Sequence, residues 1–181
     1  MGASRTFKPT NEVMEKYKPW SSNDDFKEKN KTHVRVAKLN LLLLCMEPRT
    51  NDNNDCLRKI EFNLNYLVNC AEQECNNDAY EQYKEDGEIT FCGWDTYDEY
   101  FKKDYDDWFD YAYEKLVLFA KVIPTMDYYD ENEKFSRKIS DIKSLLDDFY
   151  YEMYRQSIKK LINELLEFEL TDDECDNDIS N

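Results

Sequence analysis

The chain has 181 residues, with 40 acidic side chains against 24 basic ones and a formal net charge of −16 at pH 7. This length fits one domain, and the hydrophobic fraction of 41% with an aromatic fraction of 15% is sufficient for a packed core. The charge disfavours nucleic acid as a ligand, because a phosphate-binding protein needs a basic surface. We therefore expect no direct nucleic-acid contact and a basic protein as the partner.

The first 20 residues predict an extended arm. Pro9 and Pro19 interrupt any regular element there, and only Glu12–Tyr17 favours a helical turn. The arm begins Met-Gly-Ala-Ser-Arg-Thr, which matches the pattern for N-myristoylation of Gly2. The same pattern also occurs in sequences by chance, so Gly2 is interpreted either as an acylation site or as an unmodified residue. Membrane contact is expected only through an acylated Gly2, since one acyl chain binds weakly and the rest of the chain is acidic.

The cysteines indicate whether to expect disulfides or a metal site, and the apolar runs indicate the expected cellular location. The six cysteines form no C-x-x-C pair, and the chain has one histidine, His33. A four-ligand zinc site normally requires such pairs, so we expect free cysteines, no metal and no cofactor. The longest apolar run, Leu41–Met46, is too short for a secretory signal or a membrane span. The expected location is cytoplasmic, with membrane association only after acylation, and the chain is not expected to be secreted.

Two helices are predicted before residue 76. The polar cluster 21–25 favours a helix start, and the helix is expected to end at Met46, before Pro48. Its alternating stretch at 33–36 leaves a strand as the competing interpretation. Asp55 is expected to cap the second helix, and 76–93 is expected to be a loop with a short extended piece at 89–91. The second helix carries apolar residues at spacings of three and four: Ile60, Leu64, Leu67, Val68, Ala71 and Cys75.

The segment 93–114 is the most distinctive part of the sequence. It combines eight Asp or Glu and two Lys with two Trp, two Phe and five Tyr. The capping box formed by Thr96 and Glu99 predicts a helix that ends before Pro124. One face of this helix is expected to enter the core: Tyr97, Phe101, Tyr105, Trp108, Ala112, Leu116 and Phe119.

The last predicted helix starts near Asn132 and carries an apolar stripe as far as Phe168. Such a helix would be about 50 Å long at a rise of ~1.5 Å per residue, longer than a small bundle. It is therefore expected either to break near 155–157 or to extend as a dimerisation arm, with 132–170 as the homodimer segment. Residues 171–181 are expected to form a disordered acidic tail. The predicted fold is one all-α bundle of four to five helices over 21–170, after the arm at 1–20.

No catalytic residues are assigned. Three glycines leave no phosphate-binding loop, and a single histidine leaves few catalytic triads. The best available set of carboxylates for a metal is the helical pair Asp106 and Asp110 together with another pair, Glu72 and Glu74 or Asp147 and Asp148. A chain with this many acids contains such pairs by chance.

The remaining function is protein binding, for which there are two hypotheses. The first is an acidic adaptor or regulatory protein that binds a basic partner through its acidic-aromatic helix, because rigid aromatic side chains dominate binding energy at interfaces. The second is an inhibitor, viral in style, that mimics nucleic acid by presenting carboxylates to a DNA- or RNA-binding protein. The residues expected to contact the partner lie outside the core stripe: Asp106, Asp107, Phe109, Asp110, Tyr111, Tyr113 and Glu114.

Overall fold

A computed structural model describes residues 4–19, 25–47, 53–92, 105–126 and 132–179, with the side chains of the last helix described as far as Glu169. These residues form an all-α bundle with four long helices and one short one, which confirms the predicted fold class. In chain order the elements are β1 (Arg5–Phe7), α1 (Asn11–Glu15), α2 (Phe26–Met46), α3 (Asn53–Asp86), β2 (Ile89–Phe91), α5 (Tyr105–Val122), η1 (Ile123–Thr125) and α6 (Asn132–Ile179).

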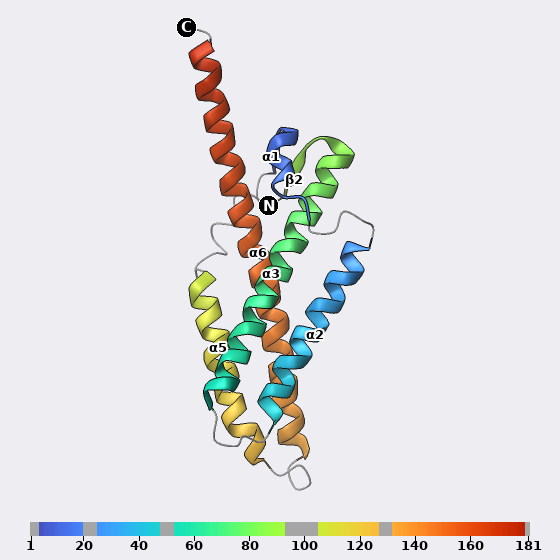
Figure 1. Cartoon of the computed structure of the whole chain (residues 1–181), viewed down its shortest axis with the longest axis vertical. Helices are drawn as coiled ribbons and strands as arrows, with labels where there is room; N and C mark the ends of the chain where they lie inside the picture. The colour runs from blue at the N-terminus through green and yellow to red at the C-terminus, as the bar shows by residue number, and fades with distance from the viewer. Residues whose placement is uncertain (1–3, 20–24, 48–52, 93–104, 127–131, 180–181) are drawn as a thin grey trace.

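The four long helices pack around one core (Figure 1), with α2 against α3, α3 against α6 and α5 against α6. Helices α2 and α5 are also in contact, since the Cys45 thiol donates to the Leu116 carbonyl at 3.6 Å. Successive long helices alternate in direction, so α3 and α6 are parallel to each other. The main core is made of small and aliphatic side chains from all four helices with one large aromatic, Phe149. Its buried members are Ala37, Leu41, Cys45, Ile60, Leu64, Leu67, Ala71, Ala112, Leu116, Ala120, Ile123, Ile142, Leu146, Phe149 and Met153.

Helix α2 is continuous, so the competing strand at 33–36 is wrong. Ala37, Leu41 and Cys45 are buried on one helical face, and this tertiary contact decides between two local patterns that the sequence permits. The helix ends as predicted: Glu47 is extended, as favoured by the proline that follows it.

Helix α3 corrects the loop predicted at 76–93, because it continues through that segment to Asp86. The spacing of four from Cys75 to Ala79 keeps both side chains buried, although the intervening residues are polar. The helix ends at Gly87, whose φ of 72° lies in the left-handed region and whose N–H donates to the Tyr83 carbonyl at 2.7 Å. Beyond it, 89–91 is extended as predicted.

The N-terminal arm packs against the upper end of the bundle. β1 pairs antiparallel with β2, with Phe7 opposite Ile89, and α1 forms where a helical turn was predicted. Phe7 and Met14 are buried together with the upper parts of α3 and α6, in a second core cluster with Cys75, Ala79, Leu161 and Leu165 among its members. The sequence predicts the arm's local structure but not this packing.

Helix α6 is continuous from Asn132 to Ile179, so no break occurs near 155–157. Its backbone remains helical where a disordered acidic tail was predicted, and its last turns extend beyond the other elements (Figure 1). The sequence after Pro124 contains no Gly or Pro to end the helix.

Two predictions lie outside the described residues. They are the acylation of Gly2 and the part of the acidic-aromatic helix before Tyr105, which includes its start at Thr96 and the expected core residues Tyr97 and Phe101. The five described cysteines are free, in agreement with the sequence. Each helix in the described ranges is too short or too polar to span a bilayer.

Tyrosine–carboxylate hydrogen bonds connect α6 to α3 and to the arm. The hydroxyl of Tyr150 donates to Glu74, that of Tyr154 to Asp78 at 2.6 Å, and that of Tyr17 to Glu164. The first two pairs advance together by four residues on each helix, which fixes the register of the parallel pair. Burial, and then the hydrogen bond to a carboxylate, raises the pKa of all three tyrosines well above the usual value of 10.

Substituting Tyr154→Phe should lower the free energy of unfolding at pH 7 by about 1.5 kcal/mol or more, because it removes a hydrogen bond to a charged group. Stability should also fall less steeply at alkaline pH. In the native protein the folded state retains the Tyr154 proton above pH 10 while the unfolded chain loses it, so stability decreases as pH rises. Urea unfolding between pH 7 and 11 measures both effects.

Tyr151→Phe is the matched control. Tyr151 lies on the same helix with its side chain 60% exposed, so its variant should match the native protein at every pH. Equal losses in the two variants would show that the hydrogen bond to Asp78 does not stabilise the contact between α3 and α6.

Candidate functional site

Helix α5 has one buried face and one exposed face. Ala112, Leu116 and Ala120 are buried in the main core. On the opposite side, Asp107, Asp110 and Glu114 are exposed, together with apolar side chains. Those apolar side chains are Tyr111 (41% exposed), Leu118 (54%) and Val122 (46%). The exposed face therefore combines carboxylates with apolar area.

A groove of about 450 Å³ lies between α5 and α6, beside this face. The aromatic side chains of the groove come from α5, and α6 contributes Leu145 with polar side chains on either side of it. The lining residues are Trp108, Tyr111, Lys115, Phe119, Asp141, Ser144, Leu145 and Asp148. We call these residues, with the exposed acids Asp107, Asp110 and Glu114, the α5–α6 site.

Aromatic rings in the site are arranged to meet cations. Trp108 and Tyr111 stack edge to face with ring centroids 6.1 Å apart. The ammonium of Lys115 lies 5.8 Å from the Tyr111 centroid, and that of Lys138 lies 5.7 Å from the Phe119 centroid. These distances allow cation–π attraction. The rings are therefore already placed where a basic side chain can lie over them.

Carboxylates complete the site on both walls. Asp141 and Asp148 line the groove from α6, and both are exposed. Asp107, Asp110 and Glu114 follow one another at spacings of three and four on α5, so they share a helical face. Five acids thus accompany Lys115 at the site, and the local field favours a cationic ligand.

The structure separates the seven residues predicted to contact a partner. Asp107, Asp110, Tyr111 and Glu114 lie on the exposed face of α5. Phe109 and Tyr113 are half-buried and pack against the main core. The Phe109 ring meets that of Phe149 edge on, with centroids 6.3 Å apart. The side chain of Asp106 lies outside the described residues. Four of the predicted residues therefore share one exposed surface, whereas two of the predicted aromatic residues pack against the core, and partner binding by these residues stays a prediction.

Sequence reasoning missed the α6 wall of the groove. Asp141, Ser144 and Asp148 are polar positions beside the predicted stripe of α6, and their spacing of three and four shows only that they share a face. Which helix that face adjoins depends on the bundle topology, which no local pattern reveals. The reverse holds for Trp108, which was assigned to the core but also lines the groove.

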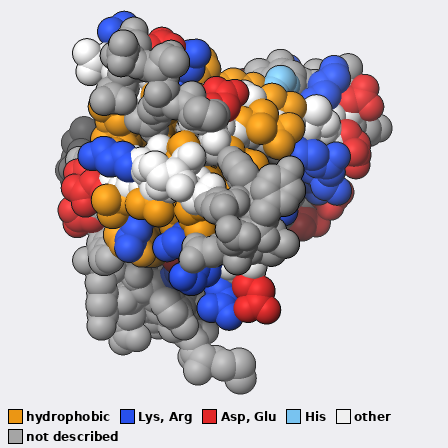
Figure 2. All heavy atoms as spheres, turned by 90° about the horizontal axis from the view of Figure 1, so that it is seen from below, with side chains coloured by type: hydrophobic (Ala, Val, Ile, Leu, Met, Phe, Trp, Pro, Cys, Tyr) orange, Lys and Arg blue, Asp and Glu red, His pale blue; other side chains and the backbone are white. Residues whose placement is uncertain are grey.

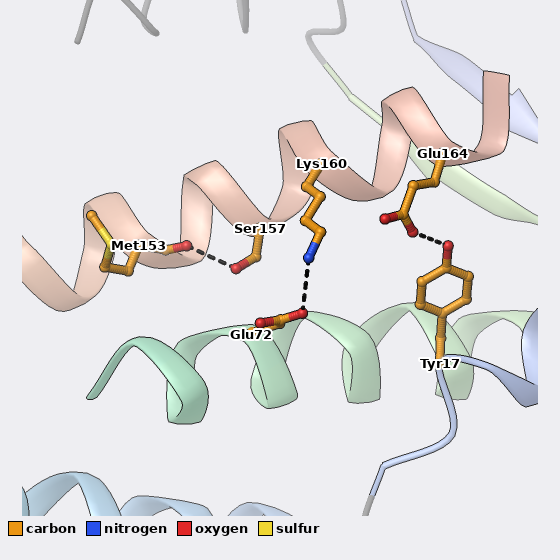
Figure 3. A network of polar contacts seen from close by, with 6 residues as sticks. All are labelled: Tyr17, Glu72, Met153, Ser157, Lys160 and Glu164. Atoms are coloured by element: carbon orange, nitrogen blue, oxygen red, sulfur yellow. Dashed lines mark hydrogen bonds and ion pairs between the residues drawn. The ribbon is translucent and has the colours of Figure 1, made fainter. Parts of the chain in front are cut away.

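A larger hollow of about 750 Å³ lies between α3 and α6, and one ion pair crosses it. Lys160 reaches across to Glu72 at 3.4 Å, while Glu164, on the same wall, accepts from Tyr17 (Figure 3). Ser157 donates within α6 to the Met153 carbonyl at 2.9 Å. Bonds that already join the two walls make this hollow a weaker candidate than the α5–α6 site.

No group of three or more His, Cys, Asp or Glu side chains in the described ranges is arranged to hold a metal ion. Burial raises the pKa of the Cys70 thiol to about 11 and that of Cys75 to about 12. Both therefore remain protonated at neutral pH and are poor nucleophiles.

Protein-family models, curated proteins and solved structures yield no match to this chain.

The α5 residues give a prediction about stability. Phe109→Ala should lower the free energy of unfolding by about 2 kcal/mol, somewhat less than the loss for a fully buried phenylalanine, because its ring packs on Phe149. Tyr111→Ala should change stability by about 0.5 kcal/mol or less, as is usual at an exposed position. Urea denaturation followed by circular dichroism measures both, and equal losses would contradict the assignment of one ring to the core and the other to the surface.

Proposed function

We propose that this protein is a non-enzymatic adaptor or regulatory protein whose α5–α6 site binds a basic segment of a partner protein. The observation that carries the proposal is the groove in which Trp108, Tyr111 and Phe119 lie between carboxylates of two helices. Aromatic walls supply apolar area at a low entropic cost, and the surrounding acids select an arginine- or lysine-rich ligand.

The chain's own lysines support this choice of ligand. Lys115 and Lys138 already lie over aromatic rings at the site. An Arg of the partner is a better ligand for this site than Lys, because its planar guanidinium stacks on an aromatic face and can form two hydrogen bonds with one carboxylate. The proposed partner segment is therefore arginine-rich, with apolar residues that enter the groove beside Leu145.

Nucleic-acid mimicry is the competing function, and the site departs from what it requires. A mimic presents carboxylates in a row where its target expects phosphates. Here Asp107, Asp110 and Glu114 provide such a row, but Tyr111 and Lys115 adjoin it. The mixed surface favours recognition of a protein segment over imitation of a phosphate backbone.

The test measures binding of a fluorescently labelled synthetic peptide with alternating Arg and Leu pairs, using fluorescence anisotropy with the full chain. Tyr111→Ala and Asp148→Asn should each weaken binding several-fold. The first substitution removes an aromatic ring on which an Arg side chain can stack, and the second removes a negative charge that attracts it. Tyr151→Ala on α6 and Glu61→Gln on α3 are matched controls at exposed positions and should bind like the native chain.

Two outcomes would contradict the proposal. One is a binding constant that changes equally in site and control variants. The other is binding that depends steeply on salt and not on Tyr111, accompanied by displacement of DNA from a DNA-binding protein, which would support mimicry.

A further inference from the structure

Helix α2 has two apolar faces, and only one of them belongs to the core. Leu41 is buried, whereas Leu39, two positions earlier and about 200° around the helix, is 51% exposed. Val36 (51%) and Leu43 (44%) are exposed on the same outer side as Leu39. A helix that is apolar on opposite faces is normally covered on both. In the described part of the chain, the outer face of α2 is therefore an apolar surface left exposed.

Helix α3 carries a further exposed apolar side chain, Phe62, at a similar height in the bundle. The side chains of Asn40 and Asn63 are joined at 3.3 Å, and this contact fixes the register of the two antiparallel helices. Leu39 and Phe62 each precede one of these residues, so they lie within about 3 Å of each other along the bundle axis. Phe62 is 69% exposed, more than any other large hydrophobic residue among those described.

A groove between the same helices extends this surface upward. It has a volume of about 440 Å³ and is lined by polar side chains and Cys70: Asn30, His33, Tyr66, Asn69, Cys70 and Gln73. The Tyr66 hydroxyl and His33 Nδ1 are joined at 2.6 Å across it. In Figure 2, hydrophobic side chains gather at the surface beside the chain's one histidine, with Lys and Arg side chains nearby.

The charge of α2 is opposite to that of the whole chain. The helix carries five Lys or Arg and one acid, Glu28, in a protein of net charge −16. Lys27 pairs with Glu81 and Lys38 with Asp147, whereas Lys29, Lys31 and Arg35 are exposed in the upper half of the helix. The outer face thus has cations at one end and apolar side chains at the other.

We propose that this surface, formed by Val36, Leu39, Leu43 and Phe62 with Lys29, Lys31 and Arg35, docks an acidic amphipathic helix of a partner protein. Helices bind in this way when apolar anchors at spacings of three, four and seven enter a groove between two helices. The exposed cations fix the direction of the bound helix, because its acidic end has to lie over the upper half of α2.

Other occupants fit less well. A second copy docked through the same face would bring two basic α2 helices together, and like charges at an interface oppose association. An anionic membrane would attract α2 but repel the acidic remainder of the molecule. A separate acidic helix meets neither difficulty. The surface also lies on the side of α2 that faces away from the core, whereas α2 contacts α5 through Cys45 on its buried side.

The experiment uses a fluorescently labelled 21-residue synthetic peptide with Leu at helical spacings of three and four and Glu on the other faces, titrated with the full chain. Binding should be measurable by anisotropy, and Leu39→Glu should weaken it roughly tenfold or more, the loss expected for an interface anchor. Arg35→Glu should weaken it and reduce its dependence on salt. Leu118→Glu, at an equally exposed position on α5, should leave it unchanged.

Circular dichroism first establishes that each variant is folded. The proposal is overturned if Leu39→Glu binds the acidic peptide as tightly as the native chain does. It is also overturned if the native chain binds vesicles of anionic phospholipid and not the peptide, or if it sediments as a dimer that Leu39→Glu dissociates. Because the probe is acidic and the variants lie on α2, failure here leaves the result for the α5–α6 site unaffected.

Discussion

The parallel contact between α3 and α6 is the constraint on which the other elements depend. Tyr150 and Tyr154 donate to Glu74 and Asp78 across this contact, so each partly buried carboxylate has a neutral donor. Without that donor a buried acid would be costly, because its charge would be removed from water with no hydrogen bond in return. An acidic chain can in this way place carboxylates between its two longest helices.

Because α3 and α6 are joined by their own contacts, the flanking helices α2 and α5 can present different outward surfaces. The N-terminal arm closes the upper end through Phe7 and Met14, while α2 packs mainly on α3 and α5 mainly on α6. Each flanking helix contributes a narrow face of small or aliphatic residues to the main core and presents its opposite face outward. That surface is acidic and aromatic on α5 but basic and aliphatic on α2. A small bundle with two outward faces of opposite charge suits a protein that brings partners together.

Sequence periodicity predicted the helices wherever one face was continuously apolar. It placed Leu41 of α2 and Leu64 of α3 in the core correctly, because burial of a stripe is a local property of the chain. It failed at 76–86, where Ala79 is buried by the distant arm and α6. It also misplaced Phe109, whose contact with Phe149 depends on how α5 and α6 pack. The α6 side of the α5–α6 groove was missed for the same reason. The local sequence of neither helix indicates which distant helix it packs against.

The most direct test of the account is cross-linking of the tagged protein in its native cells, followed by mass spectrometry of the linked peptides. Lys115 lines the α5–α6 groove and Lys138 lies over Phe119 beside it, so both are placed to report a basic partner bound there. The account predicts that an arginine- and lysine-rich partner is linked at these two lysines. Links confined to Lys8, Lys16 and Lys84, near the N-terminal arm, would contradict it.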